Sequence, residues 1–287
     1  MRITNSMMST RALRDLQANY AGLAKVQEQV SSARKLNRAS DDPAQARVAV
    51  KVRDNLNAIA QHLRNIDTAE RATDTAETAL SSAGDTVIRL KELAVQAANA
   101  TVSSSDRQAI ANEVTQLTQQ LVGYANAKSG EDYIFSGQRT RTPAYASAGA
   151  AYAGDSNALN ARIAPGVTLA TNVTADVAFG PALAAAVQLG ADLAAGSPPS
   201  AGVLTALDGS LDAILAARSR IGAVVNRLDS TRTFLESSQE SSVKLLSDLE
   251  DADMAEVISQ AAQRQAVYEA ALSVNAKILR RSLVDEL

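Results

Sequence analysis

One stretch of the chain decides its fold: residues 204–249, which read LTALDGSLDAILAARSRIGAVVNRLDSTRTFLESSQESSVKLLSDL. Its apolar residues recur at alternating spacings of three and four positions. Four polar residues interrupt the apolar seam: Arg218, Arg232, Gln239 and Ser242. An apolar repeat of about 3.5 residues sustained over this length is typical of a coiled-coil seam. The stretch therefore predicts one long helix, over about 201–249, that packs along another helix.

Both ends of the chain carry the same repeat. Near the N-terminus its positions are Leu13, Leu16, Tyr20, Leu23, Gln27 and Val30. Near the C-terminus, after an acidic break, they are Met254, Ile258, Ala261, Gln265, Tyr268, Leu272, Asn275 and Leu279. These segments have few partners in a lone subunit, and segments of this kind become ordered when they bind. We therefore expect assembly segments at 1–35 and 254–287, with the polar Gln27, Gln265 and Asn275 setting their register.

Composition favours slender helical packing over a thick globular core. The 287 residues are 46% hydrophobic but only 3% aromatic, and tryptophan is absent. Small apolar side chains each bury modest area, which suits long helices better than a deep core. The formal net charge of −3 argues against a nucleic-acid-binding surface. With no cysteine, the chain offers neither disulfides nor thiolate metal sites.

The sequence contains no sign of a cleavable signal or a membrane span. The opening MRITNSMMSTRALRDLQANY lacks the apolar run of about seven residues and the A-x-A site that a secretory signal needs. No stretch approaches the roughly 18 apolar residues of a spanning helix. A cytosolic protein and a protein exported without a cleavable signal both fit this composition, which does not separate them.

Turn and cap residues place the other elements. Residues 41–43, Asp-Asp-Pro, suit the start of a helix, because an acidic cap and a first-turn proline are both favoured there. The apolar stripe that follows runs to about Asn99, which gives a helix about 85 Å long. Residues 105–106 begin a third helix, which Gly130 ends. The β-branched and aromatic run 133–137 predicts a short strand and turn.

The predicted fold is mainly α: an elongated antiparallel helical rod with coiled-coil termini and a small β-rich or irregular middle lobe. The lobe, 144–200, is rich in Gly, Ala, Val, Thr and Pro, with short strands around Ile163 and over 167–169. The expected domains are a terminal coiled-coil assembly segment (1–35 and 254–287), a helical rod (36–143 and 201–253) with a short hairpin near 133–143, and the variable outer lobe (144–200).

No constellation of residues predicts catalysis. His62 is the only histidine, and we interpret it as a helix-surface or seam-edge side chain. The acidic clusters at 41–42 and 250–253 lie at predicted helix starts, where carboxylates favourably meet the helix dipole. The glycines of the lobe match no phosphate-binding motif. We therefore expect no catalytic, cofactor or metal site, and we do not expect an enzyme.

Five segments resemble one known family, that of bacterial flagellar hook-associated protein 3 (the FlgL family, related to the flagellins). They are MRITNSMM (1–8), NRASDDPA (37–44), RLKELAVQAAN (89–99), YIFSG (133–137) and the C-terminal stretch 247–287. The opening and YIFSG resemble the hook-associated proteins, whereas the other three segments resemble flagellins as well. Ala33-Arg34 and Pro43 depart from the flagellin pattern, which also favours the hook-associated family. The resemblance covers about 1–145 and 200–287.

The resemblance implies a structural protein of the bacterial flagellum, extracellular and exported through the flagellar type III channel. It implies a ring-like homo-oligomer at the distal end of the hook, between hook-associated protein 1 and the first flagellin subunits. An export chaperone would bind the chain before secretion. Neither nucleic acid binding nor membrane insertion is implied.

The expected assembly interface draws on both end segments. Its residues are Ile3, Met7, Met8, Leu16, Tyr20, Leu23, Val30, Ile258, Tyr268, Leu272, Asn275 and Leu279. Two alternative functions stay open at this point. One is a short flagellin, which would polymerise by itself into long filaments. The other is a cytosolic coiled-coil scaffold unrelated to flagella, which would be absent from sheared flagella and from the culture supernatant.

Overall fold

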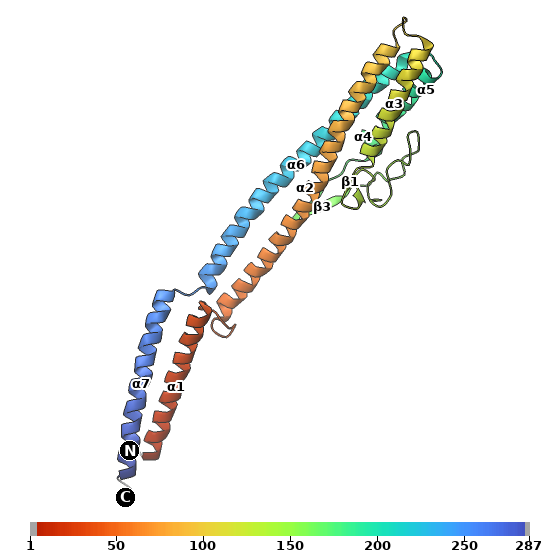
Figure 1. The fold of residues 1–287 in the computed structure, drawn as a ribbon. Helices are drawn as coiled ribbons and strands as arrows, with labels where there is room; N and C mark the ends of the chain where they lie inside the picture. Colours follow the sequence, from red (N-terminus) through yellow and green to blue (C-terminus); the bar gives the residue numbers. More distant parts are fainter. Residues whose placement is uncertain (1–4, 285–287) are drawn as a thin grey trace. The chain divides into compact units, whose positions relative to one another are not determined.

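The structure, a computed structural model, describes residues 5–284 and the side chains of residues 7–277. This part of the chain is mainly α, as predicted (Figure 1). Its helices are α1 (Asn5–Ser32), α2 (Pro43–Ala97), α3 (Ser104–Ala125), α4 (Ala175–Ala178), α5 (Gly180–Ala194), α6 (Ala201–Glu250) and α7 (Met254–Val284). Its strands are β1 (Lys128–Ser129), β2 (Asp132–Tyr133), β3 (Asn160–Ala164) and β4 (Val167–Ala170).

The chain forms two compact units. The central unit is Ile59–Ser237, and the terminal unit combines Met1–Ala58 with Ser238–Leu287. The division between them falls inside the long helices α2 and α6. It does not coincide with residues 35 and 254, where the sequence places the limits of the assembly segments.

Acidic and hydroxyl side chains fix the starts of the long helices. The Asp42 carboxylate accepts hydrogen bonds from the amides of Ala44 and Gln45, each at 3.0 Å, so it caps α2 as predicted. α3 begins with a capping box. The Ser103 hydroxyl accepts from the Asp106 amide, and the Asp106 carboxylate accepts from the Ser103 amide. The cap of α3 is therefore Ser103, two residues before the predicted start.

A hairpin follows α3, but at a different place from the predicted one. α3 ends at Ala125, and β1 and β2 form an antiparallel hairpin over 128–133, not over 133–143. Gly130, expected to end the helix, lies in the tight turn of this hairpin with φ +65°. The chain turns again at Gly137, with φ +66°, where an added Cβ would overlap the Asp155 carbonyl oxygen. Most of the YIFSG run is therefore a packed turn, and only Tyr133 belongs to a strand.

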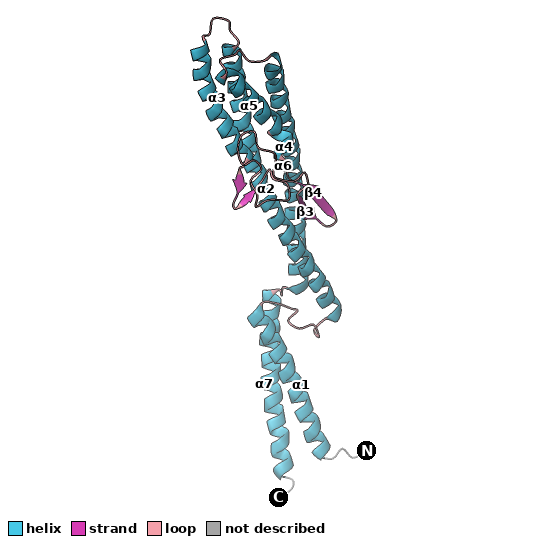
Figure 2. Cartoon of the chain, turned by 90° about the vertical axis from the view of Figure 1, so that its right-hand side faces the viewer, coloured by secondary structure: helices cyan, strands magenta, loops and turns pink. Residues whose placement is uncertain are grey.

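The middle lobe contains the two predicted short strands and two helices that the sequence pattern did not indicate. β3 and β4 pair antiparallel around Gly166 (Figure 2). α5 was missed because its proline and glycines suggest a loop. Pro181 instead occupies the first turn of α5, where its missing N–H costs nothing. Alanine and leucine fill the rest of the helix.

The central unit has a continuous apolar core formed by α2, α3, α5, α6 and the turns between them. The Phe135 and Phe179 rings meet edge to face with centroids 4.9 Å apart. Other fully enclosed side chains are Leu80, Leu90, Leu121, Leu189, Leu193, Leu207 and Ile214. This unit therefore buries large apolar side chains without help from a partner.

A second apolar cluster joins the β3–β4 hairpin to the long helices. Ile163 of β3 is fully buried among residues of α2 and α6, namely Ile59, Ile66, Ala69, Leu228 and Leu235. His62 is buried beside it, with Nδ1 3.3 Å from the Arg162 carbonyl oxygen. Of the two interpretations of His62, the helix-surface one is wrong, because the side chain is buried and contacts the hairpin, whereas a place at the edge of the seam agrees with its position.

Candidate assembly surface

The terminal helices α1 and α7 lie side by side and antiparallel (Figure 1). The centroids of the Tyr20 and Tyr268 rings are 5.8 Å apart. The Asn275 amide nitrogen donates to the Ala12 carbonyl oxygen at 3.3 Å. Leu23 and Val26 of α1 and Val257 of α7 are buried. The two end segments therefore partner each other within one chain, which differs from the expectation that they have few partners in a lone subunit.

Much apolar surface of α1 and α7 remains exposed after the helices pair. Met7 is 62% exposed, Ile258 55% and Leu272 42%, and Met8 and Tyr20 are exposed as well. Three further exposed apolar residues lie on the same two helices but are absent from the predicted interface: Leu13, Val267 and Val274. Only the first, Leu13, lies on the repeat. Exposed apolar side chains gathered on one pair of helices form a candidate surface for contact with a partner.

The structure separates the predicted interface residues into three groups. Leu23 is buried within the free chain, and its contact with a neighbouring subunit stays a prediction. Leu16, Val30, Tyr268 and Asn275 are half-buried. Ile3 and the side chain of Leu279 lie outside the described residues. The exposed members, given above, stay a prediction for contact with other subunits.

The polar positions of the end repeats behave differently from one another. Asn275 bonds across to α1, as a register-setting residue would. Gln265 bonds instead to Glu269 within α7, at 3.2 Å, and Gln27 is exposed. Asn275 therefore contributes to the register of the pair, and Gln265 does not.

The acidic cluster 250–253 does more than cap a helix. The Asp253 carboxylate accepts from the amides of Ala255 and Glu256, so it caps α7 as predicted. Glu250, the last residue of α6, is buried and forms ion pairs with Arg34 and Arg53. Its interpretation as a cap is wrong, because its carboxylate faces arginines rather than helix amides.

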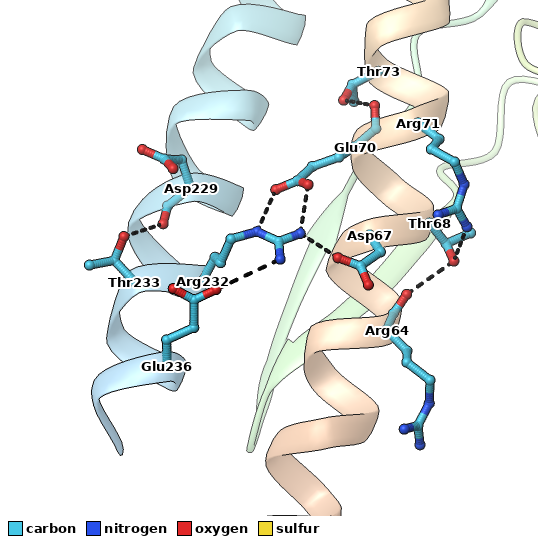
Figure 3. Close-up of polar contacts among 10 residues, drawn as sticks. All are labelled: Arg64, Asp67, Thr68, Glu70, Arg71, Thr73, Asp229, Arg232, Thr233 and Glu236. Carbon is cyan, nitrogen blue, oxygen red and sulfur yellow. Dashed lines mark hydrogen bonds and ion pairs between the residues drawn. The ribbon is translucent and has the colours of Figure 1, made fainter. Parts of the chain in front are cut away.

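Two arginines at polar seam positions of α6 bind acids of α2 in the central unit. Arg232 binds Glu70 through Nε at 3.1 Å and Nη2 at 2.6 Å, and binds Asp67 at 2.5 Å (Figure 3). The hydrogen bonds that Arg232 donates to Glu70 and then to Asp67 raise the pKa of Arg232. Arg218 donates to a single oxygen of Glu77, Oε1, through Nε at 2.9 Å and Nη2 at 2.6 Å. These pairs join the two long helices by charge-assisted hydrogen bonds at two points along their length.

The central unit also contains a hollow of about 570 Å³ between α2 and the two hairpins. Its lining includes Asn65, Asp132, Tyr133, Asn160 and Asn172. None of its lining residues is a histidine or a cysteine. Over the residues that the structure describes, no cluster of three or more potential metal ligands occurs. None of the described helices is both long and apolar enough to cross a membrane.

Comparison with known proteins assigns the chain to a family. The family model for the bacterial flagellin N-terminal helical region matches residues 3–140, and that for the C-terminal helical region matches residues 204–285. The chain is 25% identical over 299 residues to flagellar hook-associated protein 3 of Escherichia coli, covering 94% of each protein. It is 36% identical over 126 residues to a flagellin of Clostridium tyrobutyricum. That match covers 44% of this chain and only 33% of the flagellin.

Solved structures share the fold. The structure of Bacillus cereus FlgL superposes with a TM-score of 0.62 at 22% identity. The match covers 69% of this chain and 99% of that one. Since the two flagellin models together span most of the sequence, the protein belongs to the bacterial flagellin family of flagellar structural proteins.

Proposed function

We propose that the protein is the junction subunit that joins the flagellar hook to the flagellin filament. The observation that carries the proposal is the apolar surface left exposed on α1 and α7, which includes Met7, Ile258 and Leu272. Subunits that polymerise bury such surfaces against neighbouring copies and adjacent proteins. The near full-length match to hook-associated protein 3 favours the junction over the filament body.

The proposed partners follow from a position between two different structures. Copies of this chain would form a ring, with hook-associated protein 1 on one side and flagellin on the other. Before export, a chaperone would cover the exposed apolar residues of the ends, which would otherwise promote aggregation. The assembled protein would be extracellular, on the flagellum, and would have reached it without a cleavable signal peptide. It would act through contacts and stiffness, with no enzymatic step.

The test replaces exposed apolar residues without touching the helix pair's interior. We expect Ile258→Ser with Leu272→Ser to leave the free protein folded, because both side chains are exposed. In a strain lacking the natural protein, this variant should leave hooks without filaments and release flagellin into the medium. Electron microscopy of hooks and immunoblots of the medium measure both effects. Normal filaments on such cells would refute the proposal.

A matched control uses the central unit. Val177 and Val187 are exposed there to a similar degree, so Val177→Ser with Val187→Ser removes comparable apolar surface. We expect filaments to attach normally to cells that carry this control. Equal loss of filaments from both variants would show that exposure alone, and not position on α1 and α7, explains the defect.

The 36% identity to a flagellin favours a second candidate, a short flagellin that forms the filament itself. The two candidates differ in what the purified protein does. A filament subunit should extend added filament seeds into long polymers, whereas a junction subunit should stop at short assemblies. Sedimentation and negative-stain microscopy of seeded reactions distinguish them.

A further inference from the structure

The segment that follows α1 and the segment that precedes α7 are hydrogen-bonded to each other. α1 is followed by the segment 33–42, and α6 is joined to α7 by residues 251–253. The Ala252 amide donates to the Ala33 carbonyl oxygen at 3.0 Å, and the Lys35 amide donates to the Glu250 carbonyl oxygen at 2.8 Å. Arg34 and Asp251 pair between them as an isolated antiparallel bridge. We call residues 33–35 and 250–252 the clip.

The Glu250 carboxylate holds the clip to α2. Its side chain is only 4% exposed, and Arg53 Nη2 of α2 lies 2.6 Å from Oε1 and 2.7 Å from Oε2. Only the contact with Oε2 has the geometry of a hydrogen bond. Arg34 Nη1 of the clip lies farther away, at 3.7 Å. A buried carboxylate is strongly unfavourable unless it is paired, so Glu250 stays enclosed only while these arginines remain in place.

The backbone of the clip is strained, which shows that its surroundings determine it firmly. Ala33 has φ +55° and is the one non-glycine residue with positive φ among those the structure describes. Alanine adopts this conformation only at a cost in free energy. The hydrogen bond from Ala252 holds the Ala33 peptide in place. A strained conformation persists where several contacts specify it together.

Among the described side chains of the α1–α7 pair, the buried apolar ones lie near the clip. They are Leu23, Val26 and Val257, all in the clip-side half, although Ile258 beside Val257 is exposed. Lys25 also binds Asp41 at 2.9 Å, which ties this half of α1 to the segment before α2. Met7 and Leu272, far from the clip, are exposed. The pair is therefore held most firmly at the clip.

We propose that the clip is the nucleus from which α1 and α7 pair in the free subunit, and that Glu250 is its positioning residue. α1 and α7 are separated in sequence by the whole of α2 through α6. Their direct association therefore has a large entropic cost of loop closure. The clip brings the two helix ends together first. Pairing then extends outward one turn at a time, with helix formation and packing supporting each other.

The first test is hydrogen exchange of the full-length chain followed by mass spectrometry. Glu250→Gln keeps the shape of the side chain and removes its charge. We expect exchange over 7–35 and 251–277 to accelerate about ten- to a hundred-fold, with exchange over 59–237 unchanged. Glu240→Gln makes the same charge change at an exposed site on α6 and should alter neither region.

The arginines should follow their distances from the carboxylate. Arg53→Met should accelerate exchange of α1 and α7 more than Arg34→Met, because Arg53 is the nearer partner. Arg47→Met, at an exposed position on α2, is the control and should have no effect. An Arg34→Met effect as large as that of Arg53→Met would contradict the assigned geometry.

A covalent clip provides the rescue. The chain contains no cysteine, so Arg34→Cys with Asp251→Cys places a single disulfide across the antiparallel bridge, where Cα spacings suit one. Added to Glu250→Gln, the oxidised disulfide should restore slow exchange in α1 and α7, and reduction should remove it. Three outcomes would overturn the proposal: unprotected α1 and α7 in the natural chain, equal acceleration of the central unit in Glu250→Gln, or no rescue by the disulfide. Each concerns the free subunit and leaves the junction role untouched.

Discussion

The central and terminal units use the same repeat in opposite ways. In the central unit the apolar positions of α2 and α6 close on a core that also contains Phe135 and Phe179. Among the side chains of the terminal unit that the structure describes, few apolar ones are buried: Leu23, Val26, Ala49, Val52 and Val257. Large apolar side chains such as Met7 and Ile258 stay exposed there. The same periodicity therefore brings helices together in both units, but a seam is fully buried only where several elements enclose it.

The largest expected effect tests whether the central unit supplies the stability of the free chain. Phe135→Ala should lower the free energy of unfolding by about 3–5 kcal/mol, because it leaves a cavity beside Phe179. Thermal denaturation followed by circular dichroism measures it. Phe234→Ala is the matched control, since Phe234 is 68% exposed and its loss should cost less than about 0.5 kcal/mol. Equal effects of the two changes would contradict the claim that the enclosed core of the central unit supplies the stability of the free chain.

A smaller and local effect is expected in the terminal unit. Leu23→Ala should destabilise the α1–α7 pair by about 1–3 kcal/mol, because the Leu23 side chain is buried within this pair. The denaturation midpoint of the central unit should not change. Hydrogen exchange of α1 and α7, measured beside that of residues 59–237, separates the two. Leu13→Ala, at an exposed position of α1, should leave both unchanged. Destabilisation of the central unit by Leu23→Ala would show that the two units unfold as one.

The smallest expected effect appears at alkaline pH and only in the central unit. Burial, and then the nearby Asp176 carboxylate, raise the pKa of Tyr152 above its ordinary value of 10.0. The neutral phenol is favoured in the folded state, so this stabilisation is complete below about pH 10 and is lost as the pH rises further. Tyr152→Phe should flatten the alkaline decline of stability, measured by urea denaturation at several pH values. An unchanged slope would contradict the assignment.

The sequence predicts the helices well because their periodicity is local. It predicts less where distant residues decide. Arg218 and Arg232 are visible as polar interruptions of a seam, but their acidic partners on α2 are far away in the sequence. Glu250 looks like a cap because acids suit helix starts, and only the fold brings Arg53 to it. The sequence pattern does not indicate the alanine-rich α5, because its proline and glycines are typical of a loop.

The predicted interface illustrates the same limit. Periodicity shows that Leu23 and Ile258 both belong to apolar seams, yet one is enclosed and the other exposed. A repeat specifies which residues share a face of a helix. Which of those faces the chain covers by itself depends on contacts between residues that are distant in the sequence, and the repeat does not specify these.

The β3–β4 hairpin has a practical consequence for labelling this protein. Its strand carries Ile163 into the space between α2 and α6, whereas its turn, Pro165 and Gly166, points into open solvent. An affinity peptide or a fluorophore attached between Pro165 and Gly166 would be displayed without disturbing either apolar cluster. The same attachment two residues earlier would displace the buried Ile163 side chain from its contacts with α2 and α6.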